Sequence, residues 1–147
     1  MMRRTLLALL FGTALLGVGL ACSDDEPTPE EYFREFQATQ AEMSVNLGDF
    51  VGFNPFTADA ETRADFSDAL HNAVDAFEGL RSGSDFRESH SAYVRAMRQQ
   101  ADAIADADDD RLREAMRDEN AASCAIRKIA EREGLVEESL LNSCEGS

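Results

Sequence analysis

Apolar residues recur every three or four positions through four long segments of this chain, with polar and charged residues between them. That spacing places the apolar side chains on one face of an α-helix, as in helices that pack into a bundle. The alternation typical of β-strands does not extend over a useful length. The expected inward positions are Phe33, Phe36, Met43, Leu47 and Phe50; Phe66, Leu70, Ala73, Phe77 and Leu80; Phe86, His90, Tyr93, Met97, Ala101 and Ile104; and Leu112, Ala115, Met116, Ala122, Ile126, Ile129 and Ala130. The sequence therefore predicts an all-α fold.

Local signals mark where these helices begin and end. Thr28 is the expected N-cap of the first helix, because Pro29 suits the first helical position and Glu31 completes a capping box. Gly134 suits the left-handed position that follows the fourth helix. The other expected boundaries are Gly52 with Asn54 and Pro55, Thr57 or Asp59, Ser82 and Gly83, Ser84 or Asp85, and Asp109 and Asp110.

Segments of roughly 22 to 24 residues, about 34 Å long, with short connections favour antiparallel neighbours. We therefore expect an antiparallel up-down four-helix bundle, followed by a short fifth helix over residues 135–144. Cys124 lies ten residues before Gly134, and Cys144 lies ten residues after it. If the chain reverses at Gly134, the two sulfurs come level, and a disulfide would staple the fifth helix with about 3 kcal/mol of stabilisation. Two metal-binding thiolates are the alternative, but a closed site would need further Cys or His ligands.

The first 22 residues have the pattern of an export signal. Arg3 and Arg4 precede an uncharged apolar stretch, residues 5–20, which is shorter than the roughly 20 residues that cross a membrane. It ends in Val18-Gly19-Leu20-Ala21-Cys22, which resembles the lipobox of bacterial lipoproteins. The resemblance implies cleavage before Cys22 and a diacylglycerol on the sulfur of this cysteine, with fatty acids such as palmitate.

Two other interpretations of this segment stay open: Gly19 and Ala21 also form a site for ordinary signal peptidase, and the segment could remain uncut as a membrane anchor. Cysteine pairing favours the lipid. An exported chain meets an oxidising compartment, where Cys22 would otherwise be left over from a Cys124–Cys144 pair. We therefore divide the chain into a signal peptide (1–21), an acidic tether (22–28) and a helical bundle domain (29–147). We expect an extracytoplasmic protein, lipid-anchored to a bacterial membrane in the cell envelope.

The charge is strongly acidic, with 14 basic against 29 acidic residues and a net charge of −15. Removal of Arg3 and Arg4 with the signal makes the mature charge −17. Such a field repels phosphate, which argues against nucleic-acid binding and against attachment to anionic lipid headgroups. The acyl group would then provide the membrane attachment, and the acidic surface would provide solubility or attract a basic envelope protein.

Two pairs of side chains are candidate metal ligands, although the leading expectation is that the protein holds no metal and no cofactor. His71 and Asp75 are four residues apart on one helix face, and His90 and Met97 are seven apart on another. The first pair suits a divalent cation, and the second suits haem or copper. The ordinary explanations are a solvated helix face for the first pair and heptad core spacing for the second.

No motif for catalysis stands out: the chain has no G-x-S-x-G elbow, no P-loop and no dinucleotide fingerprint. We therefore expect a protein that is not an enzyme and that serves for binding, as a scaffold or as a spacer at the membrane surface. The acidic tether, heptad helices and C-terminal cysteine pair together resemble the small helical lipoproteins of GC-rich bacteria. The alternatives are a ligand or metal carrier, for copper or haem, in a bundle groove, and an inhibitor of or immunity factor against a basic partner.

Overall fold

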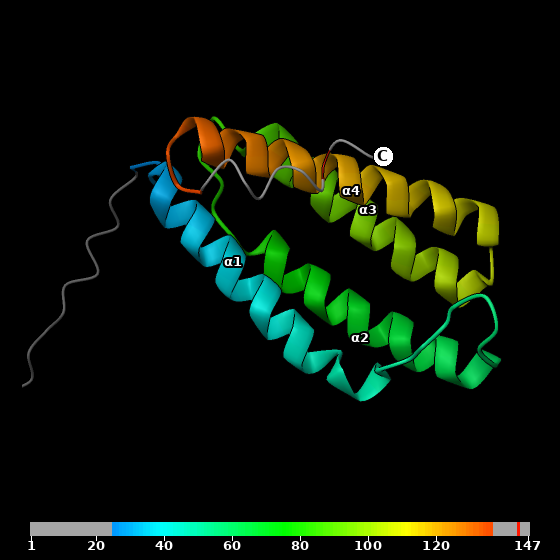
Figure 1. The fold of residues 1–147 in the computed structure, drawn as a ribbon. Helices are drawn as coiled ribbons and strands as arrows, with labels where there is room; N and C mark the ends of the chain where they lie inside the picture. The colour runs from blue at the N-terminus through cyan, green and yellow to red at the C-terminus, as the bar shows by residue number, and fades with distance from the viewer. Residues whose placement is uncertain (1–24, 137–143, 145–147) are drawn as a thin grey trace, which may run out of the picture.

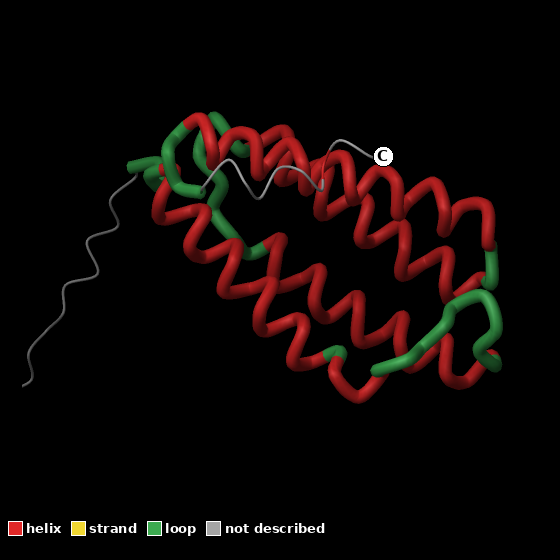
Figure 2. Tube along the Cα trace, in the orientation of Figure 1, coloured by secondary structure: helices red, strands yellow, loops and turns green. Residues whose placement is uncertain are grey.

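The computed structural model describes residues 25–136 and Cys144. Four α-helices account for most of this part of the chain, and no strand occurs in it (Figure 2). The elements are α1 (Pro29–Asn46), the 3-10 turn η1 (Gly48–Phe50), α2 (Ala60–Glu78), α3 (Arg87–Asp106) and α4 (Asp109–Arg132). The predicted all-α fold with four helices is confirmed.

Successive helices run in opposite directions, so the elements meet at two ends of an elongated bundle (Figure 1). The start of α1, the α2–α3 connection and the end of α4 lie at one end, which we call the near end. The α1–α2 loop and the tight α3–α4 turn lie at the other, which we call the far end. Over residues 25–136, no helix is both long enough and apolar enough to span a membrane.

Side-chain size explains why the helices pack at different distances. The backbones of α3 and α4 approach each other most extensively, because small residues such as Ala96, Ala103, Ala115 and Ala122 are buried on these two helices. The α1 helix stands further off, with far fewer close backbone approaches to its neighbours. Its buried residues are large aromatics, Tyr32, Phe33 and Phe36, and their rings fill the wider space.

Aromatic rings from four segments meet in the core. The ring centroid of Phe36 lies 5.3 Å from that of Phe77 on α2 and 5.1 Å from that of Tyr93 on α3. Tyr32 lies 4.5 Å from Phe86, just before α3. Such pairs contribute roughly 0.5–1.5 kcal/mol each beyond the area that they bury. These rings are therefore the main attachment of α1 to the rest of the bundle.

The predicted capping at the start of α1 is confirmed. The backbone N–H of Glu31 donates to the Thr28 hydroxyl at 3.2 Å, and the Thr28 N–H donates to the Glu31 carboxylate at 2.9 Å. The hydrogen bonds from Thr28 hold the pKa of the Glu31 carboxyl below its usual value. Asp59 and Asp108 accept the corresponding bonds at the starts of α2 and α4. These caps satisfy backbone N–H groups that have no partner within the helix.

The end of α4 at Gly134 also follows the prediction. Gly134 has a φ of 72°, in the left-handed region. Its N–H donates to the carbonyl of Glu131 at 2.8 Å, and the N–H of Leu135 donates to that of Ala130 at 2.8 Å. The two bonds form a Schellman motif, which glycine favours because it has no Cβ.

Three predicted boundaries are wrong. Helix α1 ends at Asn46, before Gly48, and the residues up to Phe50 form a separate 3-10 turn. Helix α2 ends at Glu78, before the weak helix former Gly79, and not at Ser82 and Gly83. Helix α3 begins at Arg87 with Phe86 at the N-cap position, where Ser84 or Asp85 was expected. Because Phe86 is buried against Tyr32, core packing sets this helix start and no side-chain cap does.

One predicted core residue is also misplaced. The buried positions of α4 include Leu112, Ala115, Ala122 and Ile126, and they form one stripe. Met116 lies next to this stripe and is 47% exposed. The spacing of Met116 in the sequence fits a helical apolar pattern, but the inward face of α4 is already filled by the residues of the buried stripe.

The predicted disulfide is confirmed, since Cys124 and Cys144 are bonded with their Cα atoms 5.7 Å apart. It ties Cys144 to the middle of α4. Leu135 and Val136, which follow the Schellman motif, pack against the core. The remainder of the predicted fifth helix, residues 137–143, lies outside the described residues, as do the predicted signal and Cys22.

Candidate functional site

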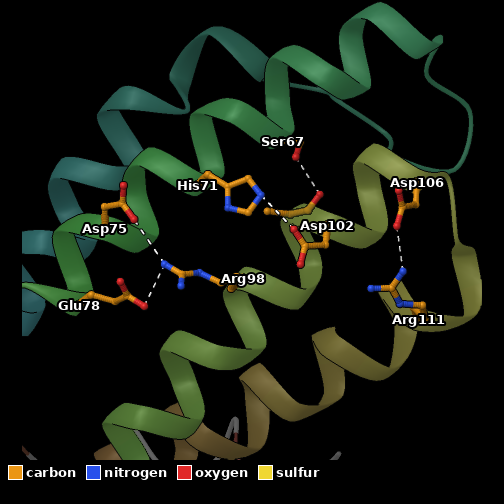
Figure 3. Close-up of polar contacts among 9 residues, drawn as sticks. Ser67, His71, Asp75, Glu78, Arg98, Asp102, Asp106 and Arg111 are labelled. Carbon is orange, nitrogen blue, oxygen red and sulfur yellow. Dashed lines mark hydrogen bonds and ion pairs between the residues drawn. The ribbon is translucent and has the colours of Figure 1, made fainter.

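A polar network joins α2 to α3 along one side of the bundle (Figure 3). The Nε2 atom of His71 lies 3.1 Å from a carboxylate oxygen of Asp102. Arg98 pairs with Glu78 at 2.9 Å and with Asp75 at 3.4 Å. All five side chains are at least one-third exposed, so each ion pair contributes little to stability, roughly 0–1 kcal/mol.

Ser67, His71 and Asp102 are the residue types of a catalytic triad, but their geometry serves a structural purpose. The Ser67 hydroxyl is buried and donates to the backbone carbonyl of Ala101 at 2.8 Å (Figure 3). A nucleophile must be reachable by substrate and must have its proton directed to the base. Ser67 meets neither condition, and its bond instead fixes α2 against α3.

The side chains of the first candidate ligand pair, His71 and Asp75, each contact a different partner on α3. His71 pairs with Asp102, and Asp75 pairs with Arg98 (Figure 3). Within residues 25–136 and Cys144, no group of three or more His, Cys, Asp or Glu side chains could hold a metal ion. Asp102 was not singled out in the sequence, because its proximity to His71 depends on how two helices align.

The second candidate pair lies in the core. Met97 is buried among apolar residues, and His90 is buried with its Nδ1 atom 3.0 Å from the Tyr32 hydroxyl. Burial lowers the pKa of His90, although a hydrogen bond to the backbone of Phe77 partly opposes this shift. The neutral ring therefore has its N–H directed to the Phe77 carbonyl, and Nδ1 accepts from Tyr32. Burial raises the pKa of Tyr32, which keeps its hydroxyl protonated. His90 thus links α1, α2 and α3.

An apolar hollow lies between the α1–α2 loop and the first half of α4, towards the far end of the bundle, and we call it the α4 groove. It has a volume of about 880 Å³. Phe56 is 40% exposed and Met116 is 47% exposed. The Arg113 guanidinium lies 4.9 Å from the centre of the Phe56 ring. The lining residues are Phe56, Asp110, Arg113, Glu114, Met116, Arg117 and Asn120.

At the near end, the residues before α1 are bound to the α2–α3 connection. We call residues 25–27 the N-terminal strap. The Arg81 guanidinium donates to the Asp25 carbonyl at 2.8 Å, and that of Arg87 donates to the Glu26 carboxylate at 2.7 Å. The strap is part of the predicted acidic tether, and it is held against the bundle by side chains from the α2–α3 connection and the start of α3.

The close packing of the strap depends on a glycine. A Cβ atom at Gly83 would lie 3.0 Å from the carbonyl oxygen of Pro27, which is tighter than about nine in ten Cβ contacts in proteins. The N–H of Ser84 lies 3.4 Å from the Glu26 carboxylate and adds a long hydrogen bond. Two basic side chains, one backbone amide and one glycine therefore form the seat of the strap.

Comparison with known proteins gives no family model, no curated protein and no solved structure that matches this chain. Three surface features remain as candidates for function: the α2–α3 polar network, the α4 groove and the N-terminal strap. The network is accounted for by helix packing. The groove and the strap are not needed for the core. The groove is lined by the α1–α2 loop and the first half of α4, and the strap is bound to the α2–α3 connection and the start of α3. Figure 1 shows that these elements meet at opposite ends of the bundle.

Proposed function

We propose that this protein is a lipid-anchored extracytoplasmic binding module that carries out no reaction and that engages an envelope protein through the α4 groove. The single observation that supports binding is the exposure of Phe56 and Met116 together in one hollow of a strongly charged surface. Contiguous exposed apolar side chains with a polar rim are typical of interaction sites. Charged residues such as Asp110 and Glu114 provide that rim.

The proposed localisation rests on the N-terminal sequence. The apolar stretch of residues 5–20 and the lipobox-like motif ending in Cys22 support export and acylation. The acidity of the mature chain supports a partner with a basic surface, because opposite charges accelerate encounter and suppress competing partners.

A carrier for copper or haem is less well supported. A carrier needs several ligand atoms that converge on one accessible space, and no group of three or more such side chains occurs within residues 25–136 and Cys144. His71 is paired with Asp102, while His90 is buried and hydrogen-bonded to Tyr32.

A capture experiment with paired variants tests the binding proposal. The soluble form beginning at Ser23 is immobilised, and envelope extract is passed over it at low and high salt. We expect one salt-sensitive partner that the Met116→Glu variant fails to retain. Val45→Glu is the matched control, because it places the same charge at a position that is 78% exposed and outside the groove. Equal retention by all three proteins would refute the assignment of the groove.

The anchor is tested separately in cells of the host type. Replacement of Cys22 by serine removes the acylated sulfur, so we expect the protein to move from the membrane fraction to the soluble extracytoplasmic fraction. Mass spectrometry of the wild type is expected to show an acylated chain that begins at Cys22. A Cys22→Ser protein that stays with the membrane would contradict lipid anchoring.

A further inference from the structure

The N-terminal strap limits how far the bundle can move from a lipid on Cys22, and this inference rests on the proposed anchor. Consecutive Cα atoms are 3.8 Å apart, so Cys22 cannot lie more than about 11 Å from Asp25. If the strap were not bound, the free chain would run to Pro29 and could reach about 27 Å. Helix α4 has 24 residues and a length of about 36 Å. The free tether is therefore much shorter than the bundle only when the strap is bound.

The seat of the strap is at the near end of the bundle. The α2–α3 connection, which supplies Arg81 and Gly83, lies there beside the start of α1 and the end of α4 (Figure 1). A short tether leaving from this end brings the end itself to the lipid surface. An unbound tether would allow the bundle to lie on any side.

Charge does not by itself choose between the two ends of the bundle. The α3–α4 turn at the far end carries Asp106, Asp108, Asp109 and Asp110. The last turns of α4 at the near end carry the basic residues Arg127, Lys128 and Arg132. The start of α1 is acidic, so the near end is not a basic patch. At the far end, Arg111 pairs with Asp106, and Arg113 pairs with Asp109 and Asp110, so both ends carry acidic and basic side chains. The orientation therefore rests on the strap.

We propose that the strap is an orienting device: it holds the bundle upright, with the α2–α3 connection facing the lipid surface and the far end pointing away. The partner of the near end is the membrane itself. In this arrangement the α4 groove lies towards the end that is further from the bilayer, where a second envelope protein can reach it.

Energy transfer from the protein to labelled lipid tests the orientation. The chain contains no tryptophan, so a single introduced tryptophan is an unambiguous donor. The full acylated protein is reconstituted into vesicles of phosphatidylcholine and phosphatidylglycerol that contain a dansylated lipid. Asp85→Trp reports from the near end, and Val51→Trp reports from the far end, where the side chain is 90% exposed. We expect transfer to be several-fold more efficient from the near-end donor.

Variants of the seat test whether the strap is the cause. Arg81→Gln with Arg87→Gln removes its two basic contacts, and we expect the difference between the two donors to shrink to less than half. Arg34→Gln with Arg95→Gln is the matched control, because it removes the same charge from side chains outside the seat, which Arg81, Gly83, Ser84 and Arg87 form. This control is expected to keep the full difference.

The possible failures are distinguishable. A protein that lacks the acyl mass or does not float with the vesicles refutes the anchor, and the orientation with it. An acylated, vesicle-bound protein with equal transfer from both donors refutes the orientation alone. A full difference that persists in the Arg81→Gln, Arg87→Gln protein refutes the role of the strap.

Discussion

Replacement of Tyr32 by phenylalanine removes a single buried hydroxyl and leaves the aromatic packing in place. Tyr32 is fully buried, and its hydroxyl lies 3.0 Å from Nδ1 of His90, which is itself buried. The variant loses this hydrogen bond and leaves the imidazole acceptor without a partner and away from water. An unsatisfied buried group costs about 1–3 kcal/mol, so we expect the free energy of unfolding to fall by about 2 kcal/mol.

Urea denaturation of the soluble form, followed by far-ultraviolet circular dichroism, measures this loss. For a domain of this size, 2 kcal/mol corresponds to a fall in melting temperature of roughly 8 °C. The slope of the transition should not change, because the surface exposed on unfolding is nearly the same. Dichroism is the suitable probe, since the chain has no tryptophan whose fluorescence could report unfolding.

A double-mutant cycle attributes the loss to the pair. His90→Leu removes the acceptor, so Tyr32→Phe in that background should cost less than about 0.5 kcal/mol. The expected coupling energy is therefore at least about 1.5 kcal/mol. The reasoning is refuted if Tyr32→Phe costs the same in both backgrounds, because the hydroxyl would then contribute without His90.

Three further predictions concern stability. Ala107 follows α3 with a φ of 55°, so Ala107→Gly should raise the free energy of unfolding by about 1 kcal/mol in urea titrations, whereas Ala105→Gly within the helix should lower it by a similar amount. Because burial depresses the pKa of His90, the unfolded chain binds more protons than the folded chain below about pH 6.5. The free energy of unfolding should therefore fall as the pH drops through this region, by at most about 1.4 kcal/mol per pH unit. Comparison with the His90→Gln variant, which lacks this titrating group, isolates the effect. Reduction of the Cys124–Cys144 disulfide, which closes a separation of 20 residues, should cost about 3 kcal/mol by thermal melting with and without reductant, and no change in melting temperature would contradict the loop-closure account.

Helix ends that depend on local chemistry could be predicted from the sequence. The Thr28 capping box and the left-handed Gly134 involve residues within a few positions of one another, and both are present. The Cys124–Cys144 bond could also be predicted, because the sequence places the two cysteines at equal distances from Gly134. These features can be predicted without knowing which distant segments of the chain contact each other.

Features that depend on tertiary packing could not be predicted. The start of α3 is set by the burial of Phe86 against Tyr32, a residue 54 positions earlier. The position of Met116 beside the buried stripe of α4 depends on small differences in helix rotation. Periodicity identified the helices but could not resolve either detail.

The candidate sites were the least predictable part. The α4 groove forms because the α1–α2 loop brings Phe56 against Arg113, far along the chain. The strap forms because Arg81 reaches Asp25, 56 residues earlier, across the seat that Gly83 leaves open. In the sequence, these residues look like ordinary surface positions, and their partners become apparent only in the folded structure.

The uneven packing of the helices has a mechanical consequence. If the proposed lipid anchor holds, a pull by the bilayer on the N-terminus would first load the bonds of Asp25 and Glu26 to Arg81 and Arg87. Once these bonds open, the pull would reach α1, the helix held mainly by aromatic rings. The alanine-rich α3–α4 pair is the most closely joined part of the bundle. Under tension, α1 would peel away first, while the half of the molecule that carries most of the α4 groove would keep its shape.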